Sequence, residues 1–210
     1  HDHGPRPSRP HRVGASRPGH HNEHRHQRGA VGRPVRQRTR LHLAVSHTEN
    51  LLPNKDGLGA PLGCLDSARY GIAWGTIGAA MDCYDTALRY SKQRIQFGKP
   101  IAGFQLQQKK LAEMITEITK AQFITWRLGV LRNEGRATSA QISMCKRNNV
   151  DMALKIARDA RQVLGGMGIT GEYPIMRHMM NLESVVTYEG THDIHLLITG
   201  LDITGENAFA

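Results

Sequence analysis

The sequence has few cysteines and no long hydrophobic run. Its three cysteines, Cys64, Cys83 and Cys145, have no CxxC spacing and no histidines placed to share a metal site. An odd, scattered set argues against a disulfide framework and favours reduced thiols inside a cell. The longest apolar stretch, Gly71–Met81, has eleven residues, which is too short to cross a bilayer. The sequence therefore predicts neither a disulfide-stabilised secreted domain nor a membrane-spanning protein.

Lysine and aromatic residues are absent from the first fifty residues, although this segment is strongly basic. It holds ten arginines, nine of the twelve histidines and three acidic residues, and almost nothing apolar precedes Leu41. Such a segment cannot bury enough apolar surface to offset its ordering entropy, so disorder is expected for residues 1–48. Residues 51–210 hold eighteen basic and fifteen acidic residues, so the high pI mainly describes the front of the chain.

Residues 1–48 allow several interpretations. An arginine-rich tail could bind nucleic acid, an arginine-rich and acid-poor segment could be an organelle transit peptide, and the histidines could bind a metal. The segment has no amphipathic period, no aromatic residue to stack on a base and no fixed ligand spacing. The sequence favours a segment without an evolved fold or function, whose composition resembles GC-rich DNA translated out of frame.

The hydrophobic pattern changes near Asn50 and predicts helices from there on. Apolar residues recur at steps of three, four and seven, and turns rich in glycine or proline separate the periodic segments. Helices are expected at about 64–94, 105–133, 140–164, 175–183 and 191–204, with residues 184–186 as a loop or helix end. Gly135 is expected to end the second helix and Ser139 to cap the third.

The predicted fold class is all-α. Three helices of roughly 25–30 residues, each about 40 Å long, are joined by short turns, which favours an antiparallel helical bundle. The expected organisation is a disordered basic segment over residues 1–48 followed by one helical domain over residues 49–210. The basic pairs Lys109–Lys110 and Lys146–Arg147 are expected on solvated faces or at subunit contacts.

Four motifs lie at the expected helix ends. Arg94 in RIQFG offers a planar donor fork suited to phosphate, although the helix dipole alone also favours arginine there. Gln105 opens a helix whose N-terminal amides can hold an anion. The run QVLGGMG (162–168) follows a helix, so it is no strand-led dinucleotide motif; it suits either close packing or approach to a flat cofactor. In TYEGTHDIH, Glu189 stands between an aromatic residue and glycine, where the simpler interpretation is a carboxylate favoured by a helix N-terminus.

Taken in order and spacing, these motifs resemble the C-terminal helical domain of the acyl-CoA dehydrogenases, and within that family the glutaryl-CoA branch. The resemblance runs from about Glu49 to Phe209. Its segments are GCL..ARYGIAWG, R.QFG.P, Q..QKKLA.M.TEIT, KRNN, LGG.GI..EY, TYEGTHDIH and ITG..AF. It implies an FAD-dependent enzyme in which a glutamate removes the α-proton of an acyl-CoA while a hydride leaves Cβ for the flavin. In the glutaryl branch the product then loses CO2 to give crotonyl-CoA.

The resemblance also assigns residues. Glu189 matches the catalytic base. The residues implied to contact FAD are Arg94, Phe97, Gln105, Gln162, Val163, Leu164, Gly165, Gly166, Thr191, His192, Asp193 and Phe209. Those implied to line the acyl-CoA site are Leu62, Gly63, Cys64, Leu65, Asp66, Ser67, Ala68, Arg69, Tyr188 and Gly190.

The residue types around Glu189 suit a base. An α-proton beside a thioester is weakly acidic, and burial raises the pKa of a carboxyl group towards what its removal needs. Tyr188 is expected to shield the carboxylate, and Gly190 to leave room for the acyl chain. His192 and His195 flank Asp193 at a spacing that a metal could use, but no further ligand is evident, so no metal is expected.

The implied partners are an acyl-CoA substrate, electron-transfer flavoprotein and further copies of the chain in a homotetramer. Neither a membrane nor nucleic acid is expected as a partner, and the expected location is the bacterial cytoplasm or the mitochondrial matrix. In the family, two further domains precede this bundle, and a neighbouring subunit holds part of the FAD. The chain is therefore expected to be a C-terminal fragment that is inactive alone. The sequence also departs from the resemblance at Met167, where the family usually has asparagine.

Two alternatives remain open from the sequence. One is another short- or medium-chain acyl-CoA dehydrogenase. The other is a non-catalytic helical oligomerisation module with a basic tail that binds nucleic acid.

Overall fold

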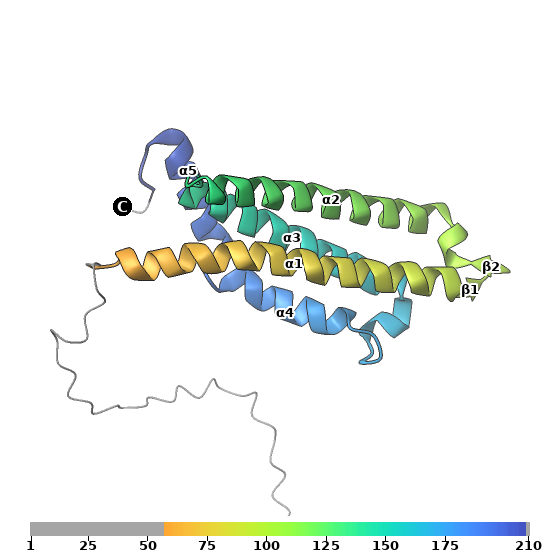
Figure 1. Cartoon of the computed structure of the whole chain (residues 1–210). Coiled ribbons are helices and arrows are strands. Elements are labelled where there is room, and N and C mark those ends of the chain that lie inside the picture. The colour runs from red at the N-terminus through yellow and green to blue at the C-terminus, as the bar shows by residue number, and fades with distance from the viewer. Residues whose placement is uncertain (1–56, 209–210) are drawn as a thin grey trace, which may run out of the picture. The chain divides into compact units, whose positions relative to one another are not determined.

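A computed structural model describes residues 57–208, which form a helical bundle (Figure 1). The α-helices of this part of the chain are α1 (Gly59–Gln93), α2 (Gln105–Asn133), α3 (Ser139–Val163), α4 (Ile175–Thr187) and α5 (His192–Thr204). Between α1 and α2 lie the strands β1 (Ile95–Gln96) and β2 (Lys99–Pro100) and the 3₁₀ helix η1 (Ile101–Gly103), and η2 (Gly165–Ile169) follows α3. The predicted all-α fold class is confirmed, whereas the expectations for residues 1–48 and for Phe209 fall outside the described residues.

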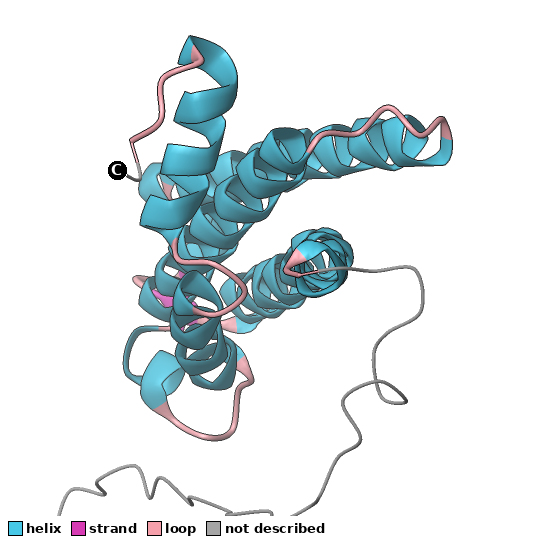
Figure 2. Cartoon of the chain, turned by 90° about the vertical axis from the view of Figure 1, so that its left-hand side faces the viewer, coloured by secondary structure: helices cyan, strands magenta, loops and turns pink. Residues whose placement is uncertain are grey.

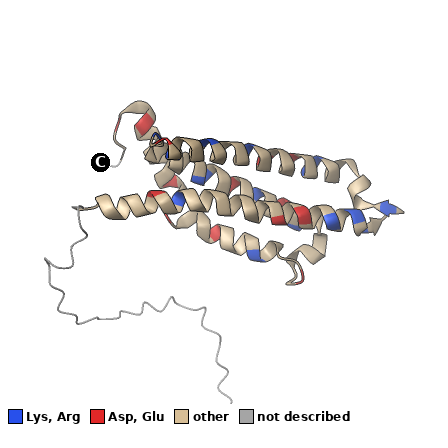
Figure 3. Cartoon of the chain, in the orientation of Figure 1, with Lys and Arg blue, Asp and Glu red and all other residues tan. Residues whose placement is uncertain are grey.

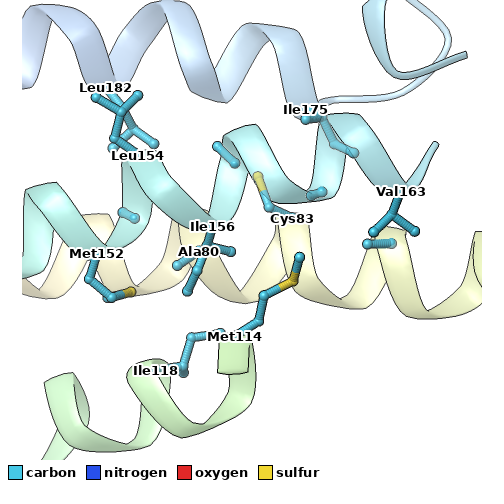
Figure 4. Close-up of a cluster of buried hydrophobic side chains, with 14 of the residues drawn as sticks. Ala80, Cys83, Met114, Ile118, Met152, Leu154, Ile156, Val163, Ile175 and Leu182 are labelled. Atoms are coloured by element: carbon cyan, nitrogen blue, oxygen red, sulfur yellow. The ribbon is translucent and has the colours of Figure 1, made fainter. Parts of the chain in front are cut away.

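Helix α3 is the central element, and it packs against α1, α2, α4 and α5. Figure 2 looks nearly along α1 and shows the other helices beside it. The main core joins apolar side chains from four helices, including Ala80, Met114, Ile156 and Leu182 (Figure 4). Alanines on the facing surfaces of α1 and α3 are fully buried, so these two long helices approach closely and form a rigid scaffold for the loops at both ends.

Some helix boundaries differ from those expected. Helix α1 begins at Gly59 and not near residue 64, because Pro61 lies in its first turn, where a missing N–H leaves no bond unmade. The prediction that Ser139 caps α3 is wrong. Thr138 is the cap, and its hydroxyl accepts from the Gln141 N–H while the Gln141 side chain accepts from the Thr138 N–H, a reciprocal capping box. Gly135, with φ of +68°, follows the end of α2 as expected.

Two further differences concern short segments. Helix α4, expected to end near residue 183, continues through residues 184–186 and buries Val185, so of the two options for these residues, loop or helix end, the structure shows the helix end. The β1–β2 hairpin was not predicted. Its turn residues, Phe97 and Gly98, both have positive φ values of 50° and 78°, as a two-residue type I′ turn requires. Two-residue strands are too short to give a period in the sequence.

Basic and acidic residues are interspersed along the helices (Figure 3). Several pair one helical turn apart, such as Lys109 with Glu113 and Lys120 with Glu117. Exposed pairs of this kind contribute well under 1 kcal/mol each, so the stability of the bundle rests on its apolar core. Within residues 57–208, no helix is both long enough and apolar enough to cross a membrane.

Candidate active site

Glu189 lies in the short connection between α4 and α5. Tyr188 ends α4, and Thr191 begins α5 by accepting a 3.2 Å hydrogen bond from the N–H of Ile194 to its hydroxyl. Between them, Glu189 has a φ of +56° and Gly190 a φ of +92°. A left-handed conformation at a residue other than glycine costs about 1–3 kcal/mol and persists only where surrounding contacts enforce it.

Two buried cations hold the backbone of this connection. The ammonium of Lys146 donates to the carbonyl oxygens of Val185, Tyr188 and Gly190, at 2.8, 3.0 and 3.0 Å. The Nε of Arg69 donates to the carbonyl oxygen of Glu189 at 2.9 Å. Lys146 is 0% exposed and Arg69 is 6% exposed. Three consecutive carbonyl groups, from residues 188 to 190, are therefore each bound to a buried cation.

The expectation for Lys146 was wrong. It lies inside the bundle and not on a solvated face, although its neighbour Arg147 is partly exposed and Lys109 is exposed as expected. Burial, followed by repulsion from Arg69, lowers the pKa of Lys146 to about 8, while the negative charge of Glu189 acts in the opposite direction. The sequence gives little sign of this role, because its acceptors lie 39–44 residues further along the chain.

The carboxylate of Glu189 has one oxygen turned into the protein. Its Oε2 is buried and accepts no hydrogen bond from any described residue. Buried polar oxygens in folded proteins are usually satisfied, so an orphaned carboxylate oxygen invites a functional explanation. A buried carboxylate oxygen without a hydrogen-bond donor is free to accept a proton, as a general base must.

His195, on α5, fills the space beside Gly190. A Cβ atom on Gly190 would lie 2.8 Å from Cε1 of His195 and 3.4 Å from Nη2 of Arg69. Glycine is therefore required at position 190 both by its φ and by close packing, in addition to the acyl-chain clearance expected from the sequence. Burial, followed by the positive charges of Lys146 and Arg69, lowers the pKa of His195 to about 4, so its ring is neutral at pH 7.

The beginning of α5 holds three predicted FAD contacts. Thr191 and Asp193 are exposed at the helix N-terminus, where free backbone amides and the helix dipole favour anions and polar ring edges. His192 faces inward: its Nδ1 lies 3.1 Å from the carbonyl oxygen of Val186, and its Nε2 lies 2.8 Å from Oδ1 of Asp151. Within residues 57–208, no three His, Cys, Asp or Glu side chains are grouped to hold a metal.

The remaining described FAD candidates lie at the other end of the bundle. Arg94 ends α1 beside the hairpin, and it lines a hollow of about 440 Å³ together with residues 162–166. Phe97 and Gln105 line an adjacent hollow of about 720 Å³, and both hollows share Gln96 and Ile101. The structure thus brings together Arg94, Phe97, Gln105, Gln162, Val163, Leu164, Gly165 and Gly166; we call this group the hairpin end.

The glycine run at the hairpin end contains one tightly packed glycine and two open ones. Gly168 is packed directly against the backbone of Arg161, whereas an added Cβ on Gly165 or Gly166 would meet nothing within 4 Å. The first two glycines therefore leave an open backbone surface, while Gly168 makes a close packing contact. Met167 packs against the main core.

The predicted FAD contacts are not brought together in one chain. We call Arg69, Lys146, Glu189, Gly190 and His195 the glutamate end. Arg69 and Arg94 are 25 residues apart on the same helix or its cap, which corresponds to about 38 Å along its axis. Because Arg69 binds the carbonyl oxygen of Glu189, the neighbouring Thr191 and Asp193 lie at the Arg69 end of α1. They are therefore far from the hollows of the hairpin end, where Arg94 lies.

The predicted acyl-CoA residues lie at the start of α1, next to the glutamate end. The exposed members of this run are Leu62, Gly63, Cys64 and Ser67. Asp66 accepts from Arg69 and from the hydroxyl of Ser139. Ala68 and Tyr188 line a groove of about 540 Å³ between α1 and α4. Tyr188 is 46% exposed, and the centroid of its ring lies 6.0 Å from the ammonium of Lys146; the expected shielding of the Glu189 carboxylate by this ring stays a prediction.

Comparison with known proteins identifies the family of the helical domain. The family model described as "Acyl-CoA dehydrogenase, C-terminal domain" matches residues 55–203. Glutaryl-CoA dehydrogenase from Mycobacterium smegmatis is 53% identical with a TM-score of 0.74, over 76% of this chain and 41% of that one. A second structure, of a glutaryl-CoA dehydrogenase from the same organism in complex with FADH2, is 47% identical with a TM-score of 0.73, over 74% and 40%.

The short-chain specific acyl-CoA dehydrogenase of Megasphaera elsdenii is 36% identical over 154 residues, which are 72% of this chain and 40% of that protein. The chain therefore spans about two fifths of the length of the relatives that it matches. Because the family model covers well over half of the chain, the chain belongs to the acyl-CoA dehydrogenase family, and residues 55–203 correspond to the C-terminal domain of that family.

Proposed function

We propose that this chain supplies the catalytic base of an α,β-dehydrogenation of an acyl-CoA thioester, with Glu189 as the base. The observation that carries the proposal is the buried Oε2 of Glu189, which has no donor among the described residues and belongs to a residue held in a left-handed conformation. The Arg69 and Lys146 contacts fix the backbone, so the carboxylate can take the α-proton without first reorganising.

We propose glutaryl-CoA as the substrate, with the unsaturated product losing CO2 to give crotonyl-CoA. The support is the 53% identity to the Mycobacterium smegmatis glutaryl-CoA dehydrogenase. The short-chain acyl-CoA dehydrogenases are the second candidate, because the Megasphaera elsdenii enzyme is 36% identical. The reaction separates two hydrogens: Glu189 receives the α-hydrogen as a proton, and the β-hydrogen departs as a hydride.

The cofactor that we propose is FAD, and the residues at both ends fit parts of it. At the hairpin end, the exposed Arg94 and Gln105 offer donors suited to a pyrophosphate, and Gly165 and Gly166 allow close backbone approach. At the glutamate end, the exposed N-terminus of α5 offers donors beside Glu189. When bound, FAD would supply the hydride acceptor, and electron-transfer flavoprotein would be the next electron carrier.

The separation of the two ends bears on assembly. Because about 38 Å of helix lies between them, we propose that each FAD is shared by two copies of the chain in a homotetramer. One copy would contribute its hairpin end and another its glutamate end. Light scattering after size exclusion measures the mass of the assembly, and a monomer that binds FAD as tightly as the assembly would contradict the sharing.

The base is tested in a chimera in which residues 49–210 replace the matching part of the Mycobacterium smegmatis enzyme. We expect crotonyl-CoA formation from glutaryl-CoA, and a loss of about 100-fold or more with Glu189→Gln. Glu183→Gln, on exposed α4 surface, is the matched control and should retain activity. Undiminished activity of Glu189→Gln would refute the proposed base.

The same chimera tests the substrate. The ratio of the rates with glutaryl-CoA and butyryl-CoA is compared with the ratio for the intact Mycobacterium smegmatis enzyme. An unchanged ratio supports a bundle adapted to glutaryl-CoA. A ratio shifted strongly towards butyryl-CoA would favour the short-chain candidate instead.

A further inference from the structure

Lys146 is the largest fully buried side chain among the described residues. Its three ammonium donors all go to backbone carbonyl oxygens, those of Val185, Tyr188 and Gly190. An ammonium has three donors and no acceptor, so its hydrogen-bonding capacity is used completely. Burying a lysine charge is costly unless it is hydrogen-bonded, so this residue calls for an explanation beyond packing.

The acceptors of Lys146 share one location. Val185 and Tyr188 belong to the end of α4, where carbonyl groups lack partners within the helix and the helix dipole favours a cation. Gly190 lies two residues beyond Tyr188, on the other side of Glu189. One ammonium thus ties the end of α4 to the residue that follows Glu189.

Arg69 completes the same arrangement from α1. Its Nε binds the carbonyl oxygen of Glu189 itself, and its Nη1 lies 3.2 Å from Oδ1 of Asp66. The peptide groups before, at and after Glu189 are therefore fixed by side chains from two different helices. These contacts can hold Glu189 at a φ of +56° against the cost of that conformation.

We propose that Lys146 is a positioning residue: by binding the carbonyl groups on both sides of Glu189, it keeps the Glu189 carboxylate turned into the protein. This inference rests on the proposed role of Glu189 as the base, since it assigns the residue that aims that base. Lys146 donates to backbone carbonyl oxygens and not to the Glu189 carboxylate, so it acts through the backbone. The interaction belongs to the chain alone and requires no bound cofactor.

The test uses the full chain and two measurements that need no turnover. Hydrogen exchange followed by mass spectrometry reports the protection of peptides covering residues 187–192. Carbodiimide labelling reports how accessible the Glu189 carboxylate is, with the exposed Glu183 as an internal reference. Lys146→Met removes the donors and keeps the apolar stem, and Lys155→Met is the control on an exposed position of α3.

We expect Lys146→Met to speed exchange in residues 187–192 by at least tenfold and to raise Glu189 labelling several-fold relative to Glu183. Protection in the middle of α1 and α2 should stay unchanged, and Lys155→Met should resemble the unmodified chain. Wild-type exchange and labelling in Lys146→Met would overturn the proposal.

A second variant at the same position keeps the proposal testable if Lys146→Met does not fold. Lys146→Gln keeps two N–H donors on a shorter side chain, and the proposal predicts an intermediate effect confined to residues 187–192. If both variants lose protection throughout the bundle, Lys146 supports the core as a whole and the positioning role is refuted. If Glu189→Gln inactivates the chimera but Lys146→Met leaves hydrogen exchange in residues 187–192 unaltered, Glu189 remains the proposed base. Only its positioning by Lys146 is then rejected.

Discussion

The two ends of the bundle are built differently. At the glutamate end, one chain supplies the contacts itself: Lys146 and His195 are 0% exposed, and three consecutive carbonyl groups bind buried cations. At the hairpin end, Phe97 is 92% exposed, Arg94 and Gln105 are exposed, and two open hollows lie side by side. The glutamate end is fixed within one chain, whereas the hairpin end presents an open surface.

A similar contrast separates α3 from α5. Helix α3 is buried along most of its length by four other helices, while α5 buries only His195 and exposes Leu196 and Ile203. Exposed apolar residues on one helix favour contact with a further surface. The elements that carry Glu189 are thus anchored on one side and open on the other, which suits a base that must meet a substrate.

The largest difference in stability between the two ends is expected when one glycine at each end is replaced by alanine. Gly190→Ala forces a Cβ to 2.8 Å from His195 at a φ of +92°, whereas Gly98→Ala, at a φ of +78°, meets nothing within 4 Å. We expect a loss of about 3 kcal/mol for Gly190→Ala, from strain and overpacking together, and about 1 kcal/mol for Gly98→Ala. Urea unfolding measures both changes in the free energy of unfolding. Equal losses would show that the glutamate end is no more tightly packed than the hairpin end.

Acid should weaken the glutamate end through His195. Its folded pKa is about 4 against an ordinary 6.5. Between these values the unfolded chain binds a proton that the folded chain does not, so this group's contribution to stability is complete above pH 6.5 and is lost as the pH falls towards 4. We expect a loss of about 2 kcal/mol from this residue between pH 7 and pH 5.

The acid effect is measured by urea unfolding at both pH values, with His195→Asn for comparison. The variant should lose less stability on acidification than the unmodified chain. An identical pH dependence in the two proteins would contradict a buried, neutral His195.

The smallest effect on stability is expected at the hairpin end. Phe97 makes one edge-to-face contact with Phe104, at 6.2 Å between ring centroids. Phe97→Ser should therefore lower the free energy of unfolding by only about 0.5 kcal/mol, while weakening FAD retention in the chimera several-fold. Met180→Ser, at an exposed position on α4, is the control. Unaltered FAD retention in Phe97→Ser would remove Phe97 from the proposed cofactor site.

Much of the fold followed from the hydrophobic period. Helix α2 occupies the predicted residues 105–133, because a long periodic segment between clear turns leaves little freedom. The β1–β2 hairpin was missed because two-residue strands give no period. The start of α1 was misplaced because Pro61 looks like a helix breaker, yet it is tolerated in a first turn.

The candidate site was predictable in its parts and not in its arrangement. The motif around Glu189 could be found from the sequence, but the burial of Lys146 could not. A lysine followed by Arg147 has the pattern of a solvated face, and only the packing of α3 against the end of α4 turns it inward. Likewise, the predicted FAD contacts formed one set along the sequence, and the length of α1 divides them between two ends.

The glutamate end is proposed to hold Glu189 as a base for the α-proton. The most direct test is exchange of the α-hydrogens of bound glutaryl-CoA with D2O in the chimera, followed by mass spectrometry. We expect deuterium incorporation with Glu189 present and a loss of about 100-fold or more with Glu189→Gln, at equal folded stability and FAD content. Exchange at the same rate in the correctly folded Glu189→Gln chimera would contradict it.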